Sequence, residues 1–155
     1  MKQYGKPLDD TRLKHMIGVA EYMYKKAPSY NLDPEEMYLL GLLHEIGYIQ
    51  GHEDNYTEYS DKLFEKIGLI SKKGKAFRVA CKMNNQVPNF TMDWGKKSYR
   101  MRYLLYEADM HITSSGKLVD YDKRLQDIYE GYSDNGVFER CQEIIKWLEL
   151  NKKED

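Results

Sequence analysis

The chain has 155 residues, the size of one ordinary domain, with 41% apolar and 32% charged residues. This balance excludes a disordered chain and a membrane-embedded one. Its 24 basic and 25 acidic residues give a net charge of −1, which argues against a partner such as extended nucleic acid and against a polybasic membrane anchor. We expect a single domain over residues 1–155.

The N-terminal sequence MKQYGKPLDD lacks the apolar segment of a secretory signal. The longest apolar run, residues 37–43, is much shorter than a bilayer span, so no membrane association is expected. Cys81 and Cys141 stand apart, without a C-x-x-C motif. We therefore expect a cytoplasmic protein whose two thiols are free in the reducing cytosol.

The composition predicts an all-α fold, because the β-branched residues Val and Thr are scarce. The first helix is expected from residue 9 or 10 to about residue 26, since its apolar residues recur with the helical period. The second is expected to begin at the sequence Asp33-Pro34-Glu35-Glu36, which supplies an N-cap, a first-turn proline and first-turn acids. It carries MYLLGLLHEIG and is expected to end near Gly47.

Further helices are expected at about 56–67, 72–82, 98–112, 121–132 and 135–150. The sequence thus predicts a compact domain of about six or seven helices. Before the helix at 98–112, the segment NNQVPNFTMDWG is expected to be a loop. With Phe90 and Trp94, it is either a lid over a pocket or a loop packed on the core.

One acid lies where an apolar residue is expected. Asp109 falls within the apolar stripe of the helix at 98–112. A buried carboxylate must be paired, be protonated or bind a metal ion. Asp109 is therefore either a capping or salt-bridged acid near the helix end, or part of a metal site.

Two histidines have a similar character. His44 lies in the apolar second helix and is followed directly by Glu45, while His15 lies beside the apolar stripe of the first helix. Either histidine alone is explained by a hydrogen bond in the core. Neighbouring helical residues point about 100° apart, so His44 and Glu45 reach one ion only if it lies beyond the helix end. Together with Asp109 they offer imidazole and carboxylate ligands for a divalent metal.

Three segments resemble the HD-domain metal-dependent phosphohydrolases, over about residues 11–133. They are RLKHMIGVA with His15, LLGLLHEIGY with His44 and Glu45, and LLYEADMHITSSGKLVDYDKRLQDIYEGY with Asp109. The resemblance implies an all-α domain that hydrolyses a small phosphate ester or a nucleotide. It also implies that these four residues bind a divalent ion (Mn, Fe, Ni, Co, Zn or Mg) that activates water. Glu45 would alternatively be a catalytic general base.

The sequence departs from the family pattern at several positions. Glu45 replaces the usual Asp and adds one methylene, so the helix or the ion must shift. Where many relatives place further histidines for a second ion, this chain has Tyr56 and the run Met83-Asn84-Asn85. We therefore expect one metal ion rather than two. We also expect Tyr56 and Asn84 to line the pocket, together with Tyr48.

A phosphorylated substrate needs cationic contacts. Arg12, one turn before His15, is the preferred substrate contact. Other basic residues near Asp109, including Arg102 and Arg124, are expected on a solvated face. His111, two residues after Asp109, is expected on the surface, facing away from the site.

Two functions remain open. In the first, the protein is an enzyme with a mononuclear metal site. In the second, it is a degenerate HD-fold relative that binds a small ligand or a protein partner without turnover. The lost second-metal histidines favour the second function, and the four retained polar positions favour the first. A homo-oligomer is compatible with both.

Overall fold

The structure is a computed structural model that describes residues 10–45, 86–131 and 136–153. Across these ranges it has five α-helices and no named strand, which confirms the all-α prediction. Their number is below the six or seven expected, because the helices predicted at 56–67 and 72–82 lie outside the described residues. The helices are α1 (Asp10–Lys26), α2 (Pro34–Leu43), α5 (Lys97–Asp109), α6 (Tyr121–Gly131) and α7 (Val137–Asn151).

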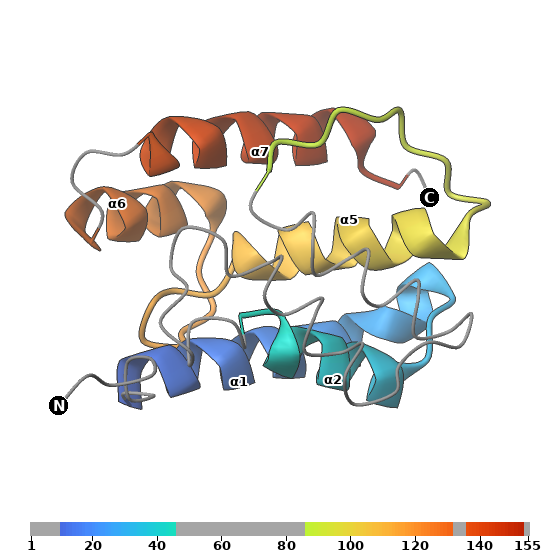
Figure 1. The fold of residues 1–155 in the computed structure, drawn as a ribbon, viewed down its shortest axis with the longest axis horizontal. Coiled ribbons are helices and arrows are strands. Elements are labelled where there is room, and N and C mark those ends of the chain that lie inside the picture. The colour runs from blue at the N-terminus through green and yellow to red at the C-terminus, as the bar shows by residue number, and fades with distance from the viewer. Residues whose placement is uncertain (1–9, 46–85, 132–135, 154–155) are drawn as a thin grey trace, which may run out of the picture.

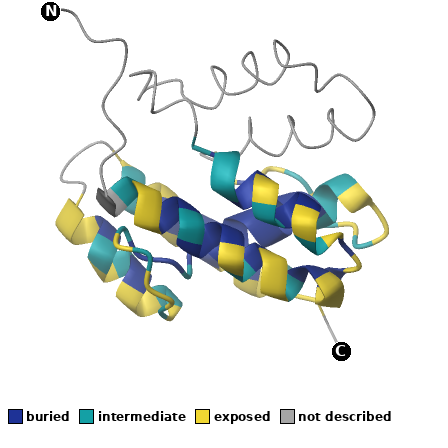
Figure 2. Cartoon of the chain, turned by 90° about the horizontal axis from the view of Figure 1, so that it is seen from below, coloured by how far each residue is buried: buried dark blue, intermediate teal, exposed yellow. Residues whose placement is uncertain are grey.

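Helix α5 lies at the centre of this arrangement (Figure 1). The antiparallel-packed pair α1 and α2 runs along one side of it, and α7 runs along the other with α6 beside it. All residues from Met101 to Ala108 are buried. Figure 2 shows that buried residues gather toward the middle of the described helices, while exposed ones lie on the outer faces. Because α5 is enclosed on both sides, its buried residues include charged ones, Arg102 and Glu107, that periodicity assigns to the outside.

The start of α2 is as predicted. The Asp33 side chain accepts a hydrogen bond from the Glu36 amide at 3.3 Å, and Pro34 occupies the first turn. The predicted end is wrong, since α2 stops at Leu43 rather than near Gly47 and His44 is its C-cap. Ahead of α2, a 3-10 helix over Ala27–Tyr30, which the sequence analysis missed, turns the chain out of α1.

Helix α5 also ends earlier than predicted, at Asp109 instead of Ile112. The residues after Asp109 use their backbone groups in a tight antiparallel turn: Thr113 N–H donates to Lys117 O at 2.8 Å, and Val119 N–H donates to His111 O at 2.8 Å. An isolated bridge joins Ile112 to Leu118 across the same turn. These hydrogen bonds replace the helical ones, so the helix cannot continue.

The segment before α5 is a packed loop rather than a lid. The Phe90 ring centroid lies 4.7 Å from that of Tyr99 and 5.2 Å from that of Trp147. The Trp94 ring lies 4.8 Å from Tyr103 in the core. These aromatic contacts fix the loop against α5 and α7.

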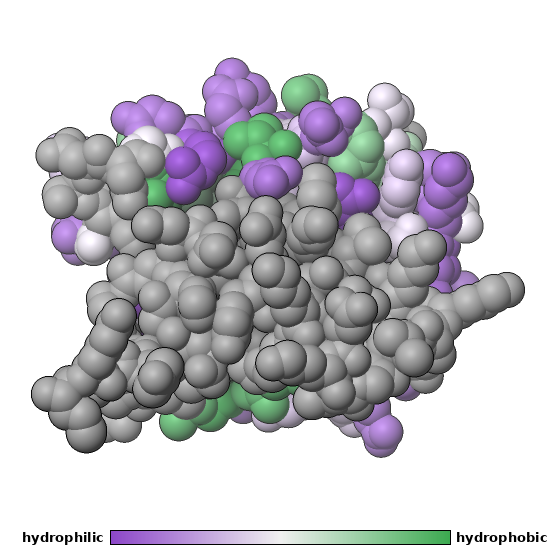
Figure 3. Space-filling view, in the orientation of Figure 1, coloured by the Kyte–Doolittle hydropathy of each residue, from purple (hydrophilic) through white to green (hydrophobic). Residues whose placement is uncertain are grey.

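The visible face over α6 and α7 mixes hydrophilic and hydrophobic side chains (Figure 3). Among the helices that the structure describes, none combines the length and the apolar character needed to cross a bilayer.

Candidate metal centre

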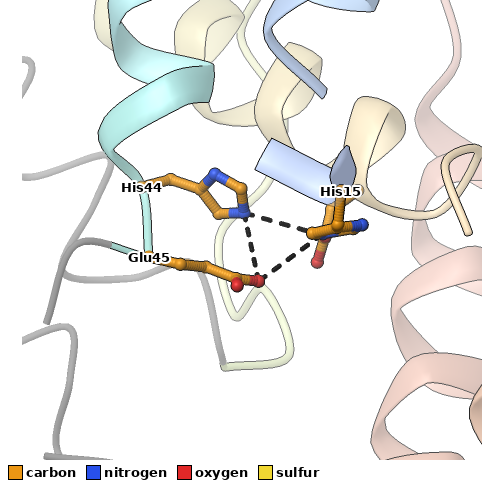
Figure 4. A group of neighbouring side chains, drawn as sticks. His15, His44 and Glu45 are labelled. Atoms are coloured by element: carbon orange, nitrogen blue, oxygen red, sulfur yellow. Dashed lines mark hydrogen bonds and ion pairs between the residues drawn. The ribbon is translucent and has the colours of Figure 1, made fainter. Parts of the chain in front are cut away.

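Four side chains predicted as metal ligands lie together. His15 comes from α1, His44 and Glu45 come directly after α2, and Asp109 is the last residue of α5. One potential ligand atom from each lies within 4.8 Å of the other three. Figure 4 shows His44 and Glu45 pointing from the end of α2 toward His15. The sequence thus identified residues that the fold brings to one point, while their role as ligands stays a prediction.

The early end of α2 explains how two neighbouring residues face the same point. His44 and Glu45 form a turn beyond Leu43. Glu45 Oε1 lies 3.4 Å from Nε2 of His44 and 3.5 Å from Nε2 of His15. The centre therefore lies off the helix end, as the angle between adjacent helical residues requires.

Both histidines are oriented by backbone carbonyls. Nδ1 of His15 lies 2.9 Å from Thr113 O, and Nδ1 of His44 lies 2.6 Å from Gly41 O. A carbonyl oxygen only accepts hydrogen bonds, so both Nδ1 atoms must carry the proton. Each Nε2 atom is left facing the carboxylates, which is the tautomer and orientation of metal-binding histidines.

Asp109 combines the two alternatives that its sequence position left open. Its Oδ1 lies 2.8 Å from His15 Nε2 and 3.8 Å from His44 Nε2. The same oxygen lies 3.8 Å from Nη2 of Arg124. Asp109 is therefore an ion-paired acid and also a member of the cluster.

One atom of the cluster points to a missing partner. His44 is fully buried, and its Nε2 has no hydrogen-bond partner among the described residues. Its nearest acceptors are Glu45 Oε1 at 3.4 Å and Asp109 Oδ1 at 3.8 Å, so a ligand at this nitrogen would complete the site. The nitrogen–oxygen separations within the cluster run from 2.8 to 3.8 Å. Two atoms that share an ion at about 2.1 Å are roughly 3.0 to 3.4 Å apart for octahedral or tetrahedral angles, so small side-chain shifts would bring the four donors onto one divalent ion.

Comparison with known proteins agrees with this geometry. The HD domain family model matches residues 12–120, well over half of the chain, and the range includes all four clustered residues. The chain belongs to the HD-domain family. The resemblance read from the sequence is thus confirmed, and with it membership of a superfamily of metal-dependent phosphohydrolases. No curated protein and no solved structure matches the chain.

The cluster of this HD domain is strongly polarised. Burial alone would lower the pKa of His15, but the charge of Glu45 and the contact with Asp109 outweigh it and raise that pKa to about 9. Burial would also lower the pKa of His44, but its contacts with Asp109 and Glu45 outweigh burial and raise that pKa to about 10. Burial would raise the pKa of both carboxyls, but the nearby histidines hold the pKa of Glu45 and of Asp109 well below their usual range.

Arg12 reaches the edge of the HD centre. Its Nη1 donates to Glu45 Oε2 at 2.9 Å, and its side chain is 30% exposed while that of Glu45 is 12% exposed. The structure therefore places Arg12 beside a proposed ligand, and its contact with substrate stays a prediction. Tyr48, Tyr56 and Asn84 lie outside the described residues.

Three basic or titratable side chains differ from the predicted solvated face. Arg124 is only 6% exposed and contacts Asp109. Arg102 is 9% exposed, with its guanidinium 4.0 Å from the centroid of the Phe90 ring, and burial lowers its pKa. His111 is half-buried rather than on the surface, stacked between the rings of Tyr22 and Tyr121. These predictions were wrong because contacts between distant segments bury positions that sequence spacing places outside.

Proposed function

We propose that this HD domain is a phosphohydrolase that acts on a small phosphate ester or a nucleotide with one divalent ion. The observation that carries the proposal is the cluster of two imidazole nitrogens and two carboxylate oxygens, in which the buried Nε2 of His44 has ion-pair contacts with both carboxylates but no hydrogen bond to the described residues. When bound, a divalent ion at such a site supplies a Lewis acid that polarises a phosphate oxygen and lowers the pKa of water.

The residues of the chain have separate tasks in this proposal. His15 and His44 would bind the ion through Nε2 while their Nδ1–H groups stay on backbone carbonyls. Glu45 and Asp109 would contribute two negative charges, which balance the charge of a divalent ion. The ion would thus be bound without a large net charge in a mostly buried place.

Glu45 fits the role of ligand better than that of general base. Its Oε1 faces the two histidines, and its Oε2 accepts the hydrogen bond of Arg12. Both oxygens thus already face cationic partners, which lowers the basicity of the carboxylate. The same contact supports a role for Arg12 in which its guanidinium, beside the bound ion, would bind an oxygen of the substrate phosphate.

The proposal of a single ion rests on the sequence. Tyr56, Met83 and the two asparagines that follow stand where many relatives carry histidines for a second ion. Neither a thioether nor an amide is a strong ligand for a first-row divalent metal. A cytoplasmic location is proposed as well, and the unbridged, buried Cys141 is in keeping with it.

The experiment is a metal analysis combined with a substrate panel. The wild-type protein is purified, its metal content is measured, and turnover of phosphomonoesters and nucleotides is assayed with added Mn, Co, Ni or Mg. Asp109→Asn is the test variant, because it keeps the volume and one acceptor oxygen but removes the charge. Glu143→Gln is the matched control, since Glu143 makes an exposed contact of 4.0 Å with Lys146 on α7.

We expect about one metal ion per chain in the wild type and in Glu143→Gln. Asp109→Asn should lose more than about 100-fold in metal affinity, because removal of a ligand costs more than removal of its outer partner. Stoichiometric metal without turnover of any phosphate ester would favour the degenerate relative that only binds a ligand. A wild type that takes up no metal would overturn the proposed function.

A further inference from the structure

Helix α6 contributes none of the four clustered side chains, yet it carries a partly buried ion pair that contacts Asp109 and the turn that orients His15. Arg124 and Asp127 lie one turn apart on α6, and Nη1 of Arg124 donates to Asp127 Oδ2 at 2.7 Å. The Arg124 side chain is 7% exposed and that of Asp127 is 27% exposed. An ordinary exposed pair at this spacing contributes little, so the burial of this one calls for another explanation.

Arg124 holds the end of α5. Its Nε donates to the backbone oxygen of Asp109 at 2.9 Å, and its Nη2 lies 3.8 Å from the carboxylate oxygen Oδ1 of Asp109. The last carbonyls of a helix have no partner within the helix. The guanidinium therefore fixes both the backbone and the side chain of a proposed ligand.

Asp127 holds the turn that orients His15. Its Oδ2 accepts hydrogen bonds from the Ser114 amide at 2.9 Å and from the Ser114 hydroxyl at 3.1 Å. The preceding residue, Thr113, offers the carbonyl that accepts the Nδ1–H of His15. The carboxylate thus binds the N–H of the same peptide group whose carbonyl sets the tautomer and the ring orientation of His15.

From these contacts we propose that Arg124 and Asp127 are positioning residues that together orient Asp109 and His15 for metal binding. His15 and Asp109 lie 94 positions apart in the sequence and come from different helices. One ion pair on a third helix restrains both, so their 2.8 Å approach is set from outside the centre. The inference rests on the proposed function, since it assumes that the cluster binds an ion.

The competing explanation is that the pair only attaches α6 to the domain. The two explanations differ in what a variant changes. A purely structural pair affects unfolding and leaves the metal affinity of the folded protein unchanged. A positioning pair changes the affinity and the geometry of the ion while the protein is still folded, because outer contacts of metal ligands set their orientation.

The test uses the full chain with Co²⁺ as the probe. Arg124→Gln, Asp127→Asn and the double variant are compared with the wild type, and Glu143→Gln is the control with an exposed pair of the same spacing. Co²⁺ affinity is measured by titration at a temperature where each metal-free variant is folded. The visible absorption of bound Co²⁺ reports the ligand geometry.

We expect each single variant to lose about 10- to 100-fold in Co²⁺ affinity and to change the Co²⁺ spectrum. The double variant should lose about as much as the larger single effect, because both residues act through one ion pair. Arg124→Lys keeps the charge but cannot donate to Asp109 and Asp127 in the same geometry, so an intermediate affinity is expected. Arg124→Lys also replaces Arg124→Gln in the test if Arg124→Gln does not fold. Glu143→Gln should bind Co²⁺ as the wild type does.

Two results would overturn different statements. If the folded variants bind Co²⁺ with wild-type affinity and spectrum, the positioning role is wrong and the proposed function stands. If the wild type binds no metal ion, the proposed function fails. NMR of the metal-free protein then tests whether Arg124 and Asp127 still orient His15. Asp127→Asn must then shift the Nδ1–H resonance of His15; an unmoved resonance would overturn the positioning role too.

Discussion

The turn between Thr113 and Lys117 connects the centre to α1, and Gly116 is the position at which it is most sensitive to change. Gly116 has φ = 87°, in the left-handed region that favours glycine. A Cβ atom at this position would lie 2.5 Å from the backbone oxygen of Lys14 and 2.9 Å from its carbonyl carbon. Because the obstacle is backbone, no side-chain rotation relieves it. Gly116→Ala must therefore move the turn away from α1.

The magnitude follows from two contributions. The left-handed conformation costs a non-glycine residue about 1–2 kcal/mol, and overpacking of a tight contact costs typically about 1–3 kcal/mol. The free energy of unfolding should fall by about 2–5 kcal/mol. For a domain of this size, each kcal/mol shifts the melting temperature by about 2–4 °C, so Gly116→Ala should melt about 4–20 °C lower.

The assay is thermal unfolding followed by circular dichroism, with Gly131→Ala as the control. A Cβ atom at Gly131, the last residue of α6, meets nothing within 4 Å. That variant should melt at or slightly above the wild-type temperature. Because the displaced turn carries the carbonyl that orients His15, Gly116→Ala should also bind Co²⁺ more weakly. A Gly116→Ala protein that melts with the wild type would refute the close approach of this turn to α1.

Two further variants separate the chemistry of the centre from packing elsewhere. Glu45→Asp shortens the side chain, which cannot then contact both the ion and Arg12, now 2.9 Å away. Metal affinity, measured by calorimetry, should fall about tenfold or more. The melting temperature of the metal-free protein should hardly change. Unaltered affinity would contradict the ligand role of this residue. Glu107→Gln removes a carboxylate whose two oxygens accept from the buried Tyr30 hydroxyl at 3.0 and 2.9 Å. This variant should lower the free energy of unfolding in urea by about 1–3 kcal/mol and leave metal affinity unchanged. A loss of Co²⁺ binding would show that the Tyr30–Glu107 contact is not independent of the metal centre.

Local signals in the sequence were sufficient to predict much of the helical framework. The bounds of α1 follow its apolar period, and the start of α2 follows from a cap formed by Asp33 and from the proline after it. Asp109 was found because a carboxylate stands out in an apolar stripe. The ligand chemistry of His15, His44, Glu45 and Asp109 suggested that they belong together, and the family pattern supported the grouping, since no periodicity relates residues on three separate segments.

The features that the sequence did not predict depend on contacts between distant segments. The end of α5 is determined by hydrogen bonds across the turn that follows it, and only the run Ser114-Ser115-Gly116 hinted at a turn there. Arg124 was placed on a solvated face because nothing in its neighbourhood indicates that the α5 carboxyl end lies against it. The orienting carbonyls of His15 and His44 are backbone groups, which no residue type can reveal.

The replacement of the family aspartate by Glu45 is, on this geometry, compatible with a working centre. The longer side chain starts from a turn after α2, and its two oxygens have distinct neighbours: the histidines on one side and Arg12 on the other. The added methylene thus lets one carboxylate face the histidines while it accepts the hydrogen bond of Arg12. Within the described residues, His44 Nε2 makes no hydrogen bond of good geometry and lies 3.4 Å from Glu45 Oε1, so the two side chains are placed to share a ligand. The His-Glu sequence is therefore compatible with the ligand pair that we propose, and the Glu45→Asp variant tests it.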